Sequence, residues 1–345
     1  MKKRFSIILA VLLCFACAAS AESVWVEEEW QHVYREIDCD GLPMIIDADV
    51  LRVPEDMMVQ EYHMDLLSSS YCRTKVSEID WESLGFPTEN MEWHVDFGYD
   101  GFNAQYSVYL FRNGEIFAGK RNTIYNRIAV NNREMYEQDW RDLPHVPFAA
   151  ADQWAEKVAE ELGLKIGRAC RGKRMDAAAI SDKLKNNPAY DEKEIAAAEY
   201  FDIYYPVYYN GMRLYSDECP GLPGETQLLE MPLHLKVTAD GLVYMRAPHI
   251  EGTLTPKGKQ KQPLTAEQAI EALASTYSDM YLPDIASMTV SEIAFEYCAM
   301  TGDRSPYKGY TLYPVWRVRS VITYQGGEQS MKYNGFHAIT GKQLY

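Results

Sequence analysis

The chain has 345 residues, a length typical of two domains or three small ones, and 47% of them are hydrophobic, enough for a buried core. Its 34 basic and 50 acidic residues give a formal net charge of −16, which argues against nucleic acid and anionic membrane surfaces as partners. Tyrosine is abundant, with 25 copies against 11 phenylalanines, as is typical of half-buried antiparallel strands.

Residues 1–21 are predicted to be a signal peptide. Basic residues at positions 2–4 precede an apolar run at 5–18, and Ala-Ser-Ala at 19–21 has the small-x-small cleavage pattern. The run is too short to span a bilayer as a mature helix. Lipid attachment at Cys17 is the alternative to cleavage, although Cys14 stands where a lipidation signal usually has a Leu-like residue. We expect an exported protein, extracellular or anchored to the outer face of the cytoplasmic membrane, and not an integral membrane protein.

Residues 22–146 are predicted to form an N-terminal α+β domain. A turn at 38–41 precedes a strand at 42–53, and residues 61–72 fit a short helix. The Asn-Gly pair at 113–114 indicates a hairpin turn.

Residues 147–255 are predicted to form a middle domain made of a helix and an antiparallel meander. Apolar residues recur at helical spacing over 149–162, and Gly163 stands where a helix ends. The charged, alanine-rich stretches 173–185 and 191–200 are predicted to be helical and to form an insertion between the first helix and its sheet. Strands with turns at 210–211 and 240–241 follow.

Residues 256–345 are predicted to form a C-terminal domain of one helix and a hairpin. The stretch 252–263 has the composition of a linker, and the helix at 265–277 begins with a Thr-x-x-Gln capping box. A strand at 290–300 and two strands around Gly326-Gly327 complete the sheet. The expected fold class is therefore α+β, with a helix packed on an antiparallel sheet in repeated units after the N-terminal segment.

The sequence contains none of the common local motifs for nucleophilic, zinc, phosphate or dinucleotide chemistry. We therefore predict no enzyme activity and assign no catalytic residue, metal or cofactor. Asp47 and Asp49 share one strand face, and we weigh calcium binding there against a polar strand face, which we favour. Tyr205, Tyr209 and Trp316 are the candidate ligand-binding residues for a peptide or glycan, against the alternative that they are ordinary sheet residues.

Two further residue sets leave alternatives open. The basic cluster either docks an acidic partner or wall polymer or is an exposed surface, which we favour. It comprises Lys165, Arg168, Arg171, Lys173 and Arg174. Five cysteines remain after the signal peptide, an odd number. The pairings to test are Cys39–Cys72 and Cys170–Cys219, against five unpaired thiols.

Several segments resemble an uncharacterised family of exported Gram-positive lipoproteins. They are Ile46–Val50 with Val53-Pro54, Tyr208–Met212, Leu235–Val237, Asp240–Val243, Pro263–Ile270, Tyr313–Trp316 and Asn334–Gly341. The last two are similar to the ending of PepSY-like domains and of the YycH and YycI regulators of a cell-wall sensor kinase, except that His337 replaces the usual Asn or Asp. The resemblance implies cystatin-like or PepSY-like units and an accessory role at the cell surface.

Together these patterns predict an exported, non-enzymatic binding or regulatory protein of the cell envelope. Its expected partner is an envelope protein or a wall-associated ligand, engaged through exposed strand edges or an aromatic sheet face. The alternative is a surface lipoprotein that binds carbohydrate or peptide.

Overall fold

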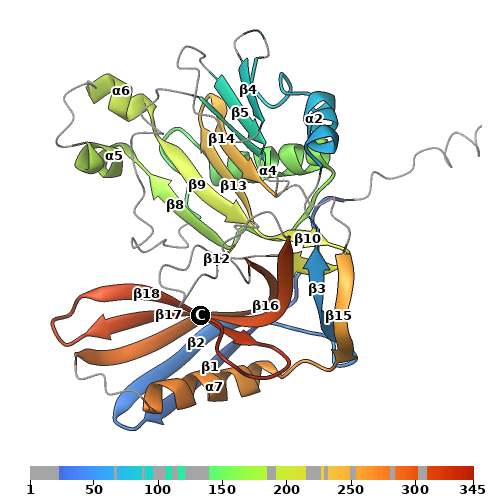
Figure 1. The fold of residues 1–345 in the computed structure, drawn as a ribbon. Coiled ribbons are helices and arrows are strands. Elements are labelled where there is room, and N and C mark those ends of the chain that lie inside the picture. Colours follow the sequence, from blue (N-terminus) through green and yellow to red (C-terminus); the bar gives the residue numbers. More distant parts are fainter. Residues whose placement is uncertain are drawn as a thin grey trace, which may run out of the picture.

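The computed structural model describes residues 23–65, 68–87, 89, 91–95, 106–110, 116–120, 140–184, 192–214, 227–228, 232–248, 254–279, 284–301 and 309–345. About 50% of these residues are in strands and 20% in helices. The strands form two large sheets, with sheet B above and sheet A below in Figure 1.

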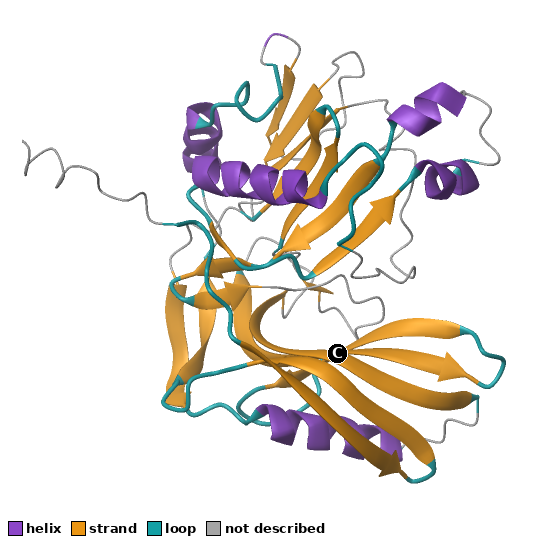
Figure 2. Ribbon diagram, turned by 180° about the vertical axis from the view of Figure 1, so that it is seen from behind, coloured by secondary structure: helices purple, strands orange, loops and turns teal. Residues whose placement is uncertain are grey.

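Sheet A is built on the long, curved hairpin of β16 and β17. On the β16 side the hairpin pairs with β2, β11 and β12, and on the β17 side with β18 and β3. Helix α7 (Ala266–Ser278) covers one face of this sheet (Figure 2). The described strands of sheet A are β1 (Trp30–Cys39), β2 (Leu42–Leu51), β3 (Val59–Met64), β7 (Lys165–Ile166), β10 (Val207–Tyr209), β11 (Met212–Leu214), β12 (Gln227–Leu228), β15 (Leu254–Lys261), β16 (Ile285–Thr301), β17 (Tyr310–Tyr324) and β18 (Gln329–His337).

Sheet B has the strand order β4-β5-β6-β14-β13-β9-β8. Its strands are β4 (Met91–Val95), β5 (Tyr106–Leu110), β6 (Ile116–Lys120), β8 (Arg171–Met175), β9 (Tyr200–Tyr205), β13 (Leu233–Thr238) and β14 (Gly241–Ala247). Helix α4 (Phe148–Leu162) packs against β9 and β13, and α2 (Ser69–Glu78) lies at its end. The short helix α5 (Ala177–Lys183) lies beside β8, and α6 (Glu192–Ala197) packs against α5.

The two sheets are joined by chain segments that pass from one sheet to the other, and they share one hydrophobic core. The chain leaves sheet B at Tyr205 and enters sheet A as β10 after Pro206, and it passes the other way between β7 and β8. A single cluster of buried apolar side chains contains residues of both sheets, from Phe201 and Leu235 of sheet B to Trp316 and Val318 of sheet A. The crossing strands therefore tie the sheets together.

Several local predictions are confirmed. Helix α4 ends at Gly163, which takes a left-handed conformation with φ 65°. The capping box of α7 is present, with Thr265 and Gln268 bonded reciprocally. The turn between β10 and β11 has φ 50° at Asn210 and 75° at Gly211, as expected for Asn-Gly between paired strands.

Other local predictions are wrong. The predicted helix at 61–72 is the end of β3 followed by the start of α2 at Ser69. The predicted linker at 252–263 contains β15, whose Gly, Lys and Gln content reflects its exposed position at the end of a sheet. The predicted turn at 113–114 lies outside the described residues.

The predicted fold class is wrong, because the molecule is mostly β-sheet and does not consist of repeated cystatin-like or PepSY-like helix-on-sheet units. Its N-terminal strands complete the sheet of the C-terminal hairpin: β2 runs parallel to β16, and β3 pairs with β17 and β15. Sheet A thus draws strands from all three predicted segments, and sheet B draws strands from the first two.

Replacing Leu273, which is fully buried under sheet A, tests the packing of α7. Leu273→Ala should lower the free energy of unfolding by about 2–5 kcal/mol, because it removes buried methyl groups and leaves a cavity. Urea unfolding measures this change. Glu271→Ala on the exposed side of the same helix is the matched control and should change stability by less than about 0.5 kcal/mol. Equal losses in both variants would contradict the packing described.

Candidate functional site

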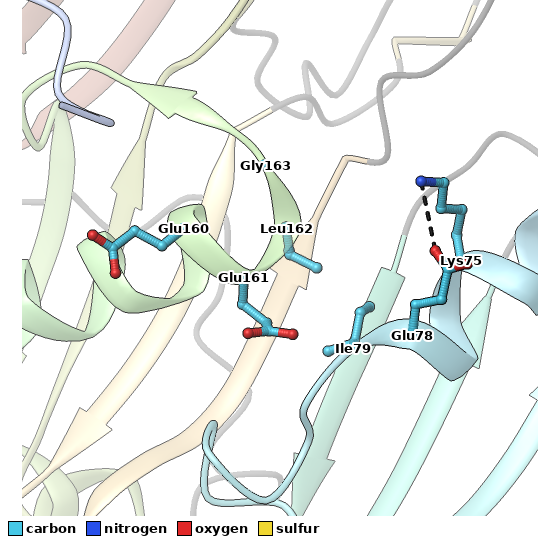
Figure 3. Close-up of a pocket in the computed structure, with 7 residues that line it drawn as sticks. All are labelled: Lys75, Glu78, Ile79, Glu160, Glu161, Leu162 and Gly163. Atoms are coloured by element: carbon cyan, nitrogen blue, oxygen red, sulfur yellow. Dashed lines mark ion pairs between the residues drawn. The ribbon is translucent and has the colours of Figure 1, made fainter. Parts of the chain in front are cut away.

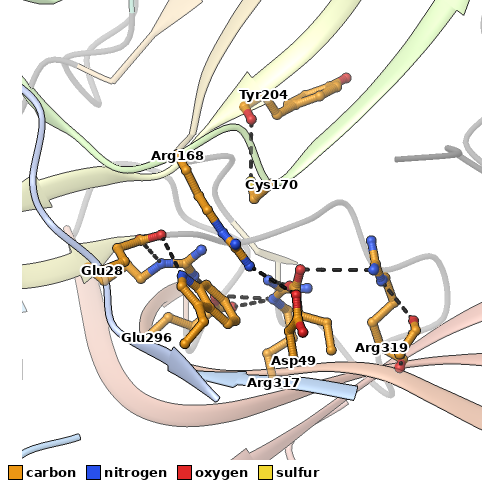
Figure 4. Close-up of polar contacts among 12 residues, drawn as sticks. Glu28, Asp49, Arg168, Cys170, Tyr204, Glu296, Arg317 and Arg319 are labelled. Carbon is orange, nitrogen blue, oxygen red and sulfur yellow. Dashed lines mark hydrogen bonds and ion pairs between the residues drawn. The ribbon is translucent and has the colours of Figure 1, made fainter. Parts of the chain in front are cut away.

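A network of buried ionised side chains lies on the face of β16 and β17 opposite α7 (Figure 4). It contains three carboxylates and three guanidiniums: Glu28, Glu292, Glu296, Arg213, Arg317 and Arg319. Successive strand residues point to opposite faces of a sheet, so alternation places Glu292 and Glu296 beside Arg317 and Arg319 across the hairpin. The other face carries Phe295 and Trp316, which pack in the apolar core.

Glu296 is the centre of the network and has no exposed surface. Arg317 Nε donates to both of its carboxylate oxygens, at 3.0 and 3.1 Å, and Arg213 Nη1 donates at 2.9 Å. On the far side, Arg317 Nη2 donates to Glu292 at 2.7 Å, and Arg319 Nη2 lies 3.9 Å from the same carboxylate. The guanidiniums are therefore shared between carboxylates.

Glu28 holds the other end of the network under the strands that cross between the sheets. Its carboxylate accepts hydrogen bonds from Arg213 Nε at 2.9 Å, Tyr208 at 2.7 Å and Trp30 Nε1 at 3.1 Å. A Cβ at Gly167, in the link from β7 to β8, would lie 2.4 Å from Glu28 Oε1, so this close approach requires glycine. The network thus fastens the crossing strands to the hairpin.

The pKa values of the two carboxylates on β16 are shifted in opposite directions. For Glu292, the nearby Arg317 and Arg319 outweigh the effect of burial and lower the pKa to about 2. For Glu296, burial raises the pKa to about 7, because the two guanidiniums that favour its charged form are shared with Glu28 and Glu292. Glu296 is therefore the group in this network that takes up a proton near neutral pH.

A second buried charged pair lies in sheet B. His234 Nε2 is 2.6 Å from Asp202 Oδ1, and Lys236 Nζ is 3.8 Å from the other oxygen of Asp202. An aspartate that orients a histidine is part of many catalytic triads. Here the ring is stacked on Tyr204 at 3.9 Å, and burial lowers the pKa of His234. Both side chains of the pair are therefore buried within sheet B and packed against its other residues.

A small hollow lies where α2 and α4 end (Figure 3). Its volume is about 260 Å³, below the usual range of ligand pockets. Its lining residues are Lys75, Glu78, Ile79, Glu160, Glu161, Leu162 and Gly163. Lys75 pairs with Glu78 at 3.6 Å, and Glu161 accepts a hydrogen bond from the Asp80 amide at 2.6 Å, so these charges serve local contacts.

The structure separates the predicted ligand-binding residues. Tyr205 is buried in sheet B, where its hydroxyl donates to Asp152 at 3.0 Å. Trp316 is buried in sheet A, where its Nε1 donates to the carbonyl of Leu264 at 2.8 Å. Tyr209 is half-buried on β10. The three residues do not form one exposed platform, because alternation turns Tyr205 and Trp316 into the core.

The structure also shows where the predicted calcium ligands and the basic cluster lie. Asp47 and Asp49 flank His32, whose ring nitrogens are 3.1 and 3.4 Å from them. Over the described ranges, no group of three or more His, Cys, Asp or Glu side chains is placed to hold a metal ion. Arg168 stacks over Trp30 at 4.2 Å, whereas Arg171 is buried in sheet B, so the basic cluster is divided.

The cysteines are not paired as proposed. Cys39 and Cys170 are buried thiols outside any disulfide, so neither the Cys39–Cys72 nor the Cys170–Cys219 disulfide is formed. Burial raises the pKa of Cys170 to about 12, which keeps it as an unreactive thiol. Cys17 lies outside the described residues.

Several described strands of sheet A have one neighbour only, and two of them, β15 and β1, differ in how their open edge is built. β15 is exposed from Thr255 to Lys261, but Pro256, three lysines and an irregular register around Gly258 protect it against further strand pairing. β1 itself contains no proline, and it forms ten consecutive residue pairs with β2 without a bulge. Within the described residues β1 pairs with β2 alone, and Tyr34 on it is 62% exposed.

The backbone groups of β1 can be assigned to its two edges. The amide of Arg52 donates to the carbonyl of Glu29 at 2.8 Å, in the same register as the β1–β2 pairs. Because hydrogen-bonded pairs alternate along an antiparallel ladder, the odd-numbered residues 31–37 direct their N–H and C=O groups to β2. The even-numbered residues 32–38 direct theirs to the free edge. The sequence signal for this edge was the regular strand pattern without Pro or Gly at 30–39, which sequence analysis did not recognise as a strand.

Comparisons with known proteins define the fold only. No family model matches the chain, and no curated protein matches it. The crystal structure of an uncharacterized protein from Eubacterium rectale is similar over 90% of this chain and 93% of that chain, with a TM-score of 0.58 and 13% sequence identity. At this identity the likeness shows a common fold.

None of the helices in the described part of the chain has the length and apolar character needed to cross a membrane.

Removing Arg317 tests the buried network. Arg317→Met should lower the free energy of unfolding by roughly 3–5 kcal/mol, because Glu292 and Glu296 remain buried after losing their shared guanidinium. The matched control is Arg52→Met, which removes an exposed pair with Glu29 at 3.2 Å and should cost less than about 1 kcal/mol. Chemical denaturation distinguishes the two, and a small, equal effect of both variants would show that the network adds little.

The pKa of Glu296 predicts a pH dependence of stability. Since its pKa rises from 4.5 to about 7 on folding, its contribution is fully present below pH 4.5 and is lost as pH rises to 7. Compared with Glu296→Gln, the native protein should lose roughly 3 kcal/mol of stability over this interval, at about 1.36 kcal/mol per pKa unit. Denaturation at a series of pH values measures the difference, and a difference that does not vary with pH would contradict the raised pKa. Glu292 acts at lower pH, because its contribution is present above pH 4.5 and is lost as pH falls toward 2.

Proposed function

We propose that this protein is an exported, non-enzymatic binding protein of the cell envelope, which recruits a protein partner by adding an extended segment of that partner to β1. The signal-peptide pattern of residues 1–21 supports export. The observation that carries the binding role is the unprotected edge of β1, which contrasts with the protected edge of β15 in the same sheet.

Strand addition uses main-chain hydrogen bonds for affinity and alternate side chains for specificity. The even-numbered residues 32–38 of β1 offer free backbone donors and acceptors over one uninterrupted row. An open strand edge of this kind favours association with another chain unless it is covered. A partner strand is therefore the occupant that this edge fits best.

The alternative, a glycan- or peptide-binding surface lipoprotein, relies on an aromatic platform at Tyr205, Tyr209 and Trp316. Burial of Tyr205 and Trp316 gives this alternative less support than the strand edge.

Photo-crosslinking in the producing cells tests the proposal. A photoreactive residue replaces Glu36, which lies on the free edge, and a second protein carries it at Lys259 on β15. The position-36 protein should give one discrete adduct with an envelope protein, identified by mass spectrometry, and the position-259 protein should not.

A pair of substitutions at Tyr34 makes the test specific for the backbone edge. Tyr34→Pro removes an N–H that faces away from β2, and Tyr34→Ala removes the same ring but keeps the N–H. We expect Tyr34→Pro to lower the adduct yield about tenfold relative to Tyr34→Ala, since a lost interface hydrogen bond costs about 1–3 kcal/mol. Equal yields from both variants would count against strand addition.

A further inference from the structure

The side chains around β1 define the chemistry of the segment that fits there, an inference that rests on the proposed function. We propose that the partner segment is extended and alternates apolar residues with lysine or arginine. Apolar side chains would lie on the α7 side of sheet A, and basic side chains on the opposite side.

The side of β1 and β2 opposite α7 is acidic. Even-numbered residues of β1 and odd-numbered residues of β2 point to this side, because the register pairs His32 with Asp49 and Tyr34 with Asp47. Its carboxylates are Glu36, Asp38, Asp47 and Asp49. The side chains of Asp47 and Asp49 are 54% and 48% exposed. Arg168 Nη2 lies 3.4 Å from Asp49 Oδ2. His32 also lies between Asp47 and Asp49, at 3.1 and 3.4 Å, but both carboxylates remain about half exposed, so basic side chains of an incoming strand can reach them.

The α7 side of β1 carries two half-buried apolar side chains among exposed polar ones. Val33 and Ile37 pack against the core cluster that contains Ala269 and Ile270 of α7. Between them, Arg35 forms an ion pair with Glu267 at the start of the helix. A strand added to β1 would place its side chains on this face beside Val33, Arg35 and Ile37 in turn, and apolar residues beside Val33 and Ile37 would extend the existing layer.

The two sides of β1 together favour a partner segment in which apolar and basic residues alternate. Since side chains of a strand alternate between faces, one segment meets the apolar side and the acidic side in turn. Cross-strand pairs of opposite charge and apolar pairs each favour the segment by about 0.2–1 kcal/mol. The free backbone groups of β1 fix its position along the edge.

A second copy of this chain is a poorer occupant of the edge. Antiparallel pairing of β1 with itself about Tyr34 would bring two acidic faces side by side. Each chain also carries a formal net charge of −16, so the copies repel each other. Charge therefore favours a basic segment from another protein.

Peptide binding to the mature protein tests the inference. The probes are three capped octapeptides in which valine alternates with lysine, with glutamine or with glutamate, each carrying the same fluorophore. Fluorescence anisotropy at low salt should show that the lysine peptide binds at least about tenfold more tightly than the glutamine peptide, and that the glutamate peptide does not bind. Raising the salt concentration should weaken only the lysine peptide.

Two variants separate the charge from the backbone edge. The double variant Asp47→Asn, Asp49→Asn should reduce binding of the lysine peptide and leave that of the glutamine peptide unchanged. Tyr34→Pro should weaken both peptides relative to Tyr34→Ala. Hydrogen exchange should locate the bound lysine peptide by slower exchange in residues 30–38.

The outcomes that overturn the inference differ from those that overturn the proposed function. Equal binding of the lysine and glutamine peptides, both sensitive to Tyr34→Pro, would refute the basic pattern and leave strand addition in place. Salt-independent dimerisation of the protein through β1, detected by sedimentation, would assign the edge to a second copy and refute the inference. If no peptide binds and cellular crosslinking at position 36 also fails, the proposed function fails as well.

Discussion

The burial of charge on β16 and β17 is the constraint on which the rest of the structure depends. Glu296 and Arg317 are almost completely removed from water, and ions in this position cost several kcal/mol each unless their partners are held in place. Their partners come from the segment before β1, from β11 and from the hairpin itself. These segments must therefore assemble together, and the strands that cross between the sheets are fixed at the same point.

Local structure could be predicted from the sequence where a local signal determines it. The capping box at Thr265 and the glycine at position 163 define helix ends, and both occur as expected. The parallel pairing of β2 with β16 joins segments more than two hundred residues apart and leaves no local signal, so the fold class was missed. The buried network had a signal: charged residues at alternate positions of otherwise apolar strands, such as Arg317 and Arg319.

The same sheet shows how charge can serve two purposes. On β16 and β17 the ionised groups are buried and satisfy one another, which fits a structural role. On β1 and β2 the carboxylates remain exposed beside an open strand edge, which fits recognition. β15 carries the proline, lysines and irregular register that prevent pairing, and the absence of these features from β1 distinguishes its edge from that of β15. The open edge of β1 is therefore the part of sheet A that best fits a binding role.

The measurement that tests this account most directly is residue-resolved hydrogen exchange along β1 in the isolated mature protein. Amides of the odd-numbered residues 31–37 bond to β2 and should exchange slowly, whereas those of the even-numbered residues 32–38 face the free edge and should exchange rapidly. Alternating fast and slow exchange would show that the edge is open to a partner. Uniform protection of residues 31–38 would show that the edge is already occupied and would contradict the account.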